Sequence, residues 1–187
     1  ANRGMIIDRN GEPLAVSTPV DTVWADPRKL AQHPQEFARL AKALDRDKNW
    51  LARRVTSNLD REFVYLVRHM RPADAAKVKA LGISGVDTLR EYRRYYPAGE
   101  VTGHLLGFTN VDDVGQEGLE LAFDQWLGGE PGIKRVMRDR EGRTIEDIER
   151  IKAPRPGQDL RTSIDLRVQY LAYRALKQAV QENSAHG

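Results

Sequence analysis

The residues near the start of the chain are of the types that chemistry uses. Arg3–Ser17, which reads RGMIIDRNGEPLAVS, holds two arginines, two acids and a serine. Nucleophilic catalysis by Ser17 would need a base beside it, and no histidine lies within fifteen residues of it in the sequence. The Asn-Gly pair between apolar runs instead predicts a β-hairpin turn, in which the carboxylate of Asp8 accepts backbone hydrogen bonds. We therefore expect a structural turn here, and a self-contained hydrolase that uses Ser17 or His104 stays as an alternative.

Metal and cofactor chemistry have little support in the sequence. His104 has Glu100 four residues before it, but the other histidines, His33, His69 and His186, share no spacing typical of a metal site. A structural histidine is therefore expected at position 104. The chain contains no phosphate loop, no dinucleotide fingerprint, and neither a Ser-x-x-Lys nor a Lys-Thr-Gly motif. The sequence predicts no catalytic residue, no metal ligand and no cofactor.

A cluster of basic and aromatic side chains suggests a second alternative, a nucleic-acid module. The segment REYRRYYP (90–97) contains Arg90, Tyr92, Arg93, Arg94, Tyr95 and Tyr96. Tyrosine rings can stack on bases while arginines contact phosphates. Alternation along a strand would divide these side chains between two faces, however, and the net charge of +3 does not demand an anionic partner. We expect no nucleic acid.

Three acids lie close together in a later segment that has helical periodicity. Glu120 and Asp124 are four residues apart and share a helix face, and Glu117 precedes them. Because apolar positions adjoin these acids, a salt bridge to an arginine of the strand layer is expected rather than acid-base catalysis. We expect Arg3, Asp8, Glu117 and Glu120 to be buried or half-buried in an ion-pair network that joins a base to a lobe.

Length and composition limit the fold and the kinds of site that this chain can form. The 187 residues suffice for one core, or for a small domain with an inserted lobe. There is no cysteine, which excludes disulfides, thiol catalysis and thiolate metal sites. No run approaches the roughly 20 apolar residues of a membrane helix, and no signal-peptide pattern is present. The chain starts with Ala almost directly on a strand, so we expect a fragment of a longer protein.

Hydrophobic periodicity outlines the secondary structure. Strands are predicted at 5–7, 14–18, 20–26, 61–70 and 85–97, and a second hairpin at 133–148. Helices are predicted at 27–32, 34–44, 47–58, 72–81, 98–108 and 115–129, followed by a linker at 154–159. A long amphipathic helix lies within 160–183, with an apolar stripe made of Val168, Leu171, Ala172, Ala175, Leu176, Ala179 and Val180. We expect this stripe either to pack on the preceding hairpins or to be covered by an absent domain or by a second copy of the chain.

Four ordered blocks resemble one protein family. They are RGMIIDRNGEPLA, REYRRYYPAGEVTGHLLGFTN, GQEGLELAFDQWLGG and VMRDREGRTI. In this order they resemble the N-terminal module of class B penicillin-binding proteins, the monofunctional peptidoglycan transpeptidases. The closing LRTSIDLRVQYLAYRAL is similar to the join to their transpeptidase domain. The long second and third blocks are most similar to the division-specific type (FtsI), and the elongation-specific type is the alternative.

The resemblance implies a fold and a role. The fold would be α+β: a β-hairpin base (1–20 and 131–165), an inserted α/β lobe (21–130), and a linker helix (166–187) before an absent transpeptidase domain. The role would be that of a non-catalytic pedestal in an enzyme of septal cell-wall synthesis. The resemblance implies that this enzyme is a single-pass inner-membrane protein of a Gram-negative bacterium and that the pedestal lies in the periplasm. The implied partners are its own transpeptidase domain, the SEDS-type glycan polymerase FtsW and other division proteins, with a possible homodimer through the terminal helix.

The family's catalytic Ser-x-x-Lys serine has no counterpart in this chain, so no catalytic residue can be transferred to it. The residues that match the family blocks are structural or interdomain candidates. They are Arg3, Asp8, Gly11, Arg94, Pro97, Gly99, His104, Gly107, Glu117, Gly118, Glu120, Asp139 and Gly142.

Overall fold

The computed structural model describes residues 1–138 and 144–184, and the chain divides into two compact units. Unit 1 comprises Ala1–Thr18, Arg94–Pro131 and Pro154–Gly187, and unit 2 comprises Pro19–Arg93 and Gly132–Ala153. This division assigns 94–131 to the same unit as the N-terminus, whereas the expected lobe ran from 21 to 130. The expected base, lobe and linker stay a prediction about how the chain is organised.

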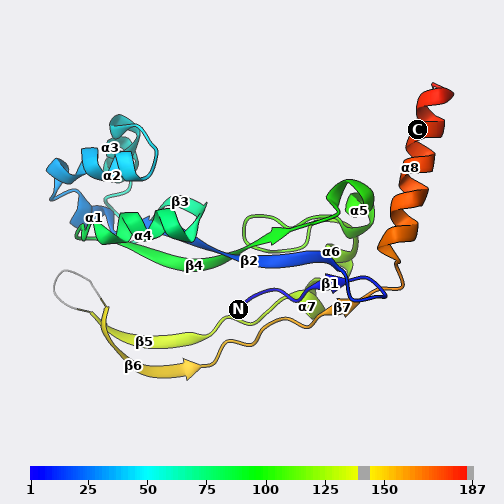
Figure 1. Ribbon diagram of the computed structural model, residues 1–187. Coiled ribbons are helices and arrows are strands. Elements are labelled where there is room, and N and C mark those ends of the chain that lie inside the picture. The colour runs from blue at the N-terminus through cyan, green and yellow to red at the C-terminus, as the bar shows by residue number, and fades with distance from the viewer. Residues whose placement is uncertain (139–143, 185–187) are drawn as a thin grey trace. The chain divides into compact units, whose positions relative to one another are not determined.

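The described residues of unit 1 form short strands and four helices. Strand β1 (Ile6–Ile7) pairs antiparallel with the start of β2 (Pro13–Ala25) and parallel with β7 (Leu160–Arg161). The helices are α5 (Gly99–Leu106), α6 (Gly118–Ala122), α7 (Asp124–Leu127) and α8 (Leu166–Glu182). The core of this unit consists of Ile6, Leu14, Ala15, Leu106 and Leu127. Figure 1 shows α8 in orange to red directly after β7.

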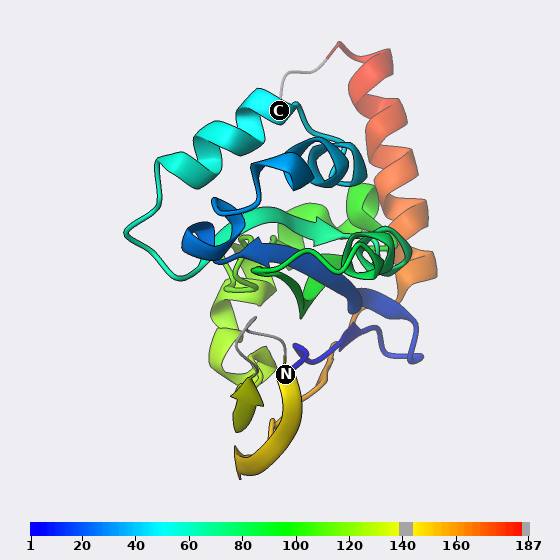
Figure 2. The ribbon, with the colours of Figure 1, turned by 90° about the vertical axis from the view of Figure 1, so that its left-hand side faces the viewer.

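Unit 2 contains the rest of β2, with β3 (Val64–Met70) and β4 (Val86–Tyr95) paired to it. The helical elements are α1 (Pro27–Leu30), a 3-10 turn (Pro34–Glu36), α2 (Phe37–Ala43), α3 (Lys48–Thr56) and α4 (Pro72–Ala80). Figure 2 shows α2 and α3, in blue to cyan, above the strands β2 and β3. Val23, Ala25 and Leu66 of the sheet share a buried cluster with Leu40, Leu51 and Val78 of the helices. The hairpin of β5 (Ile133–Arg138) and β6 (Thr144–Lys152) completes the unit.

The α+β class is confirmed, but two predicted elements are wrong in detail. The strands predicted at 14–18 and 20–26 form the single strand β2, which continues through Pro19. The helix predicted at 115–129 is two short helices, because Gly118 has a φ of +57° at the start of α6 and Phe123 leaves helical geometry at its end. The remaining predicted elements are present with ends displaced by a few residues, and the DREG turn of the second hairpin (139–142) lies outside the described residues.

The apolar stripe of α8 is exposed. Val168, Leu171 and Leu176 retain 63, 61 and 66% of their surface, so the stripe does not pack back on the hairpins. The side of α8 next to α5 is fixed by polar contacts: Glu100 accepts hydrogen bonds from the Tyr173 hydroxyl at 2.8 Å and from Lys177 Nζ at 2.6 Å. Within the described part of the chain, no helix has the length and apolar character needed to cross a membrane.

Candidate functional site

Two arginines and two acids form a buried ion-pair network in unit 1. Arg3 comes from the N-terminal segment, Arg94 from the end of β4, Glu120 from α6 and Asp124 from the start of α7. Arg3 is 2% exposed and Glu120 is completely buried. Two cations face two anions, of which Asp124 is 34% exposed, so the charges of the network balance.

Glu120 is the centre of the network. Its Oε2 accepts a hydrogen bond from Arg3 Nε and its Oε1 accepts one from Arg94 Nε, both at 2.7 Å. Its backbone carbonyl also accepts a bond from Arg3 Nη2 at 2.7 Å. Arg3 Nη1 reaches the Asp124 carboxylate at 2.7 Å and the Asp113 carbonyl at 3.1 Å. The predicted salt bridge between this helix and an arginine of the strand layer is therefore present.

Arg94 also ties the N-terminal segment to the network. Its Nη1 donates to the carbonyl of Gly4 at 2.7 Å and to the hydroxyl of Ser17 at 3.2 Å. Strand alternation leaves the adjacent Arg93 and Tyr95 exposed. The group of arginines and tyrosines that suggested nucleic-acid binding is thus divided, with Arg94 inside the core.

The electrostatics of the network follow from burial and pairing. Burial opposes the charge of Arg3, but hydrogen bonds with Asp124 and Glu120 raise its pKa. Burial, together with the charge of Glu120, raises the pKa of Tyr96 to about 12. Burial also raises the pKa of Asp113, although Arg3 and Arg94 act in the opposite direction. The hydrogen bonds from the two acids therefore favour the charged form of the Arg3 guanidinium.

Close backbone approach positions these side chains. Gly107 has a φ of +71°, and a Cβ there would lie 2.0 Å from the carbonyl oxygen of Glu117. Gly118 has a φ of +57°, and its Cβ would lie 2.5 Å from the carbonyl oxygen of Leu105. Only glycine permits both the left-handed backbone and the contact. The segment between α5 and α6 can therefore fold tightly enough to bring Glu120 to the arginines.

Asp8 has a separate structural role. Its carboxylate accepts backbone hydrogen bonds from Asn10 at 2.7 Å, Glu12 at 2.9 Å and Leu166 at 3.1 Å. Burial raises the pKa of Asp8, but these bonds outweigh it, so the net shift is downward. The hairpin with its turn at Gly11, whose φ is +91°, is confirmed. Asp8 joins this turn to the first residue of α8 instead of joining the ion-pair network.

The other sequence candidates have varied positions. Glu117 is exposed, so the prediction that it is buried is wrong: it lies in the extended segment before α6, not on the inner helix face. His104 is exposed on α5. Pro97 and Gly99 line a groove of about 650 Å³ with residues of α8. Asp139 and Gly142 lie outside the described residues. Sequence reasoning missed Asp113, and it did not say which arginine of the strand layer pairs with Glu120, because no local signal shows which face of β4 is buried.

Comparison with known proteins establishes the family. A family model described as the penicillin-binding protein dimerisation domain matches residues 1–162. The chain belongs to this family. The chain is 47% identical over 184 residues to the probable peptidoglycan D,D-transpeptidase PbpC of Pseudomonas aeruginosa, covering 98% of this chain and 33% of that protein. It is 46% identical over 189 residues to the peptidoglycan D,D-transpeptidase FtsI of Escherichia coli, covering 98% of this chain and 32% of that protein. The chain thus spans about a third of these relatives.

Solved structures share the fold. The Helicobacter pylori PBP2, solved in a complex with MreC, superimposes with a TM-score of 0.71 at 22% identity, covering 95% of this chain and 37% of that one. Penicillin-binding protein 2X of Streptococcus thermophilus gives a TM-score of 0.67 at 20% identity, covering 97% of this chain and 31% of that one. At these identities the likeness concerns the architecture of the dimerisation domain alone. The resemblance drawn from the four sequence blocks is confirmed.

Proposed function

We propose that this chain is the N-terminal, non-catalytic pedestal of a class B penicillin-binding protein that acts as a septal D,D-transpeptidase. The observation that carries the proposal is the match of nearly the whole chain to one third of transpeptidases such as FtsI of Escherichia coli. The remaining two thirds of such a protein would hold the catalytic serine. The pedestal would position that domain on the periplasmic side of the inner membrane and would bind division partners, among them the glycan polymerase FtsW.

The geometry supports a positioning role. The buried network joins the N-terminal segment, the end of β4 and helices α6 and α7 through charge-assisted bonds of fixed direction. Helix α8 carries an exposed apolar stripe that a following transpeptidase domain would cover. Burying each large apolar side chain of the stripe would contribute about 1.5–3 kcal/mol. A homodimer through α8 would bury the same stripe, and the mass of this chain in light scattering distinguishes the two arrangements.

Penicillin labelling tests the catalytic part of the proposal. The complete protein should acquire a fluorescent penicillin at its serine, and this chain alone should not. Labelling of this chain alone would refute the pedestal role, and lack of labelling of the complete protein would refute the transpeptidase assignment.

Depletion of the complete protein in its host tests the division assignment. A septal enzyme should leave elongating cells that fail to divide, whereas rounded cells would indicate an elongation enzyme. Re-expression of the complete wild-type protein should restore the normal shape, and serves as the control.

A further inference from the structure

A group of large apolar side chains faces solvent on α6 and α7. Leu121, Phe123 and Trp126 are 54, 41 and 48% exposed. Together with Gln158 and their helix neighbours they line a groove of about 580 Å³. The Trp126 ring is held in place, because its Nε1 donates to the carbonyl of Asp159 at 3.2 Å. Single exposed apolar residues are ordinary, but two aromatic rings and a leucine around one groove are typical of a protein-binding site.

The loop before α6 extends this surface. Gly115 lies so close to α6 that a Cβ would be 2.1 Å from the carbonyl oxygen of Glu120. Its amide donates to the Asp124 carboxylate at 2.8 Å, which fixes the loop further. Val114, the residue before it, is exposed. The loop therefore adds an apolar side chain next to α6 on a backbone that is already ordered.

The segment that contains α5, α6 and α7 is acidic, whereas the whole chain has a positive net charge. Residues 96–133 contain seven acids and no lysine or arginine, although the whole chain carries 30 basic and 27 acidic residues. Arg3 and Arg94 neutralise Glu120 and Asp124. Glu117 is exposed directly before α6, and Asp112 and Glu130 are exposed on either side in sequence. Glu100 is also paired, with Lys177 of α8. The groove thus lies in a segment rich in acids, with Glu117 exposed directly before α6, within a chain of positive net charge.

We propose that the surface formed by Val114, Glu117, Leu121, Phe123 and Trp126 binds a basic amphipathic segment of a partner protein. Leucine or aromatic side chains of that segment would enter the groove, and its lysines or arginines would face the acids. The inference deepens the proposed function and rests on it, because it assigns a place and a chemistry to partner binding. The occupant is a different protein and not a second copy of this chain.

Two synthetic peptides test the chemistry of the partner. One is an amphipathic 16-residue helix with Leu and Trp on one face and Lys on the other, and the second has Glu in place of every Lys. Fluorescence anisotropy should give at least tenfold tighter binding of the lysine peptide to this chain. The difference should shrink as salt shortens the range of charge interactions from about 10 Å at 0.1 M. Equal binding of the two peptides would overturn the proposal.

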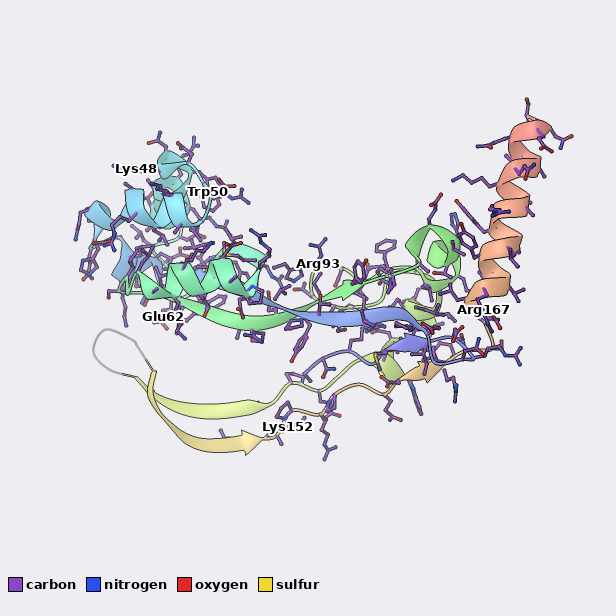
Figure 3. The ribbon with its side chains drawn as sticks, viewed as in Figure 1. Lys48, Trp50, Glu62, Arg93, Lys152 and Arg167 are labelled. Atoms are coloured by element: carbon purple, nitrogen blue, oxygen red, sulfur yellow. The ribbon has the colours of Figure 1, made fainter. Side chains whose placement is uncertain are left out.

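Matched variants test the location. Leu121→Ser with Glu117→Lys should weaken binding of the lysine peptide at least tenfold. The control pair Leu59→Ser with Glu62→Lys changes the same residue types in unit 2, where Leu59 is 46% exposed and the Glu62 side chain 79%. Figure 3 labels Glu62 there. The control should change binding less than twofold, and both variants should melt within a few degrees of the wild type, since all four side chains are exposed.

Three outcomes of the variant experiment would also overturn the proposal. They are equal effects of the two variants, no effect of the Leu121 variant, and self-association of this chain that the Leu121 variant abolishes, which would assign the surface to a second copy. Penicillin labelling of the complete protein does not depend on this surface, so failure here is distinguishable from failure of the proposed function.

Discussion

Removal of the Arg3 guanidinium is the most informative perturbation of the network. Arg3→Met keeps a long apolar side chain but deletes four hydrogen bonds, to Glu120 Oε2, the Glu120 carbonyl, Asp124 and the Asp113 carbonyl. Glu120 keeps Arg94, and Asp124 keeps the amide of Gly115. The site then holds one cation and two anions, so an excess negative charge is shared by the buried Glu120 and by Asp124, whose side chain is 34% exposed.

Breaking a buried ion pair by removing one partner costs about 3–5 kcal/mol. For a chain of this size, 1 kcal/mol lowers Tm by about 2–4 °C. Arg3→Met should therefore lower the melting temperature of unit 1 by roughly 6–20 °C. Urea unfolding and thermal melting by circular dichroism measure the cost. Hydrogen exchange locates it: the amides of Gly4 and Gly115 should lose protection, while that of Leu51 in the core of unit 2 should keep it.

Arg39→Met is the matched control. Arg39 also pairs with a carboxylate at 2.7 Å, that of Glu36, but its side chain is 57% exposed. Exposed pairs contribute about 0–1 kcal/mol, so this variant should melt close to the wild type. A double variant of Arg3→Met and Glu120→Gln should cost less than the sum of the two single changes, because the charges left behind partly cancel. Equal costs for Arg3→Met and Arg39→Met would refute the reasoning.

Three further predictions concern single residues of unit 1. Because the pKa of Asp8 is lower in the folded chain than its ordinary 3.8, its contribution is present above that pH and is lost as the pH falls through the folded pKa. Asp8→Asn should thus lower stability to urea at pH 7, and the difference from wild type should shrink near pH 3; a constant difference would contradict the assignment. Because the pKa of Asp113 is raised, its ionisation opposes folding as the pH rises above 3.8. Asp113→Asn, which also tolerates the φ of +64°, should raise Tm at pH 7 and have no such effect at pH 3. Gly118→Ala should destabilise the chain by more than about 1–2 kcal/mol in urea unfolding, because it adds a backbone clash to a left-handed conformation. Gly103→Ala, whose Cβ would meet no atom within 4 Å, is its control and should be neutral or stabilising.

Elements set by adjacent residues could be predicted from the sequence. The helix predicted at 27–32 is present, and Asp26 caps it by accepting the amides of Arg28 and Lys29 directly before the proline at its first position. The predicted last helix is also present, and Asp165 caps it by accepting the amides of Arg167 and Val168. Figure 3 shows Arg167 at that end of α8. Such signals succeed because the cap and the amides it satisfies are two or three residues apart.

Features set by distant contacts could not be predicted in the same way. Glu117 and Glu120 are three residues apart and would share a face in one continuous helix. Gly118 lies between them with a left-handed backbone, so α6 starts after Glu117 and the two acids do not share a helix face. The conformation of Gly118 follows from its packing against Leu105 and Gly107. Likewise, alternation separates Arg93 from Arg94 but does not say which of the two is buried. The family resemblance gave the candidate structural residues. The fold determines which of their side chains are in contact, as Arg3 and Arg94 are with Glu120.

The ionic character of the network bears on how a pedestal works. An apolar cluster of the same volume could replace a buried ion pair with little loss of stability, so stability alone does not explain the arrangement. Apolar contacts tolerate small shifts, whereas the two guanidinium groups donate along fixed directions to Glu120, Asp124, Ser17 and three backbone carbonyls. Displacing α6 would break several charge-assisted bonds at once. We infer that the network fixes the orientation of α6 and α7, and with it the solvent-facing side that carries Leu121, Phe123 and Trp126.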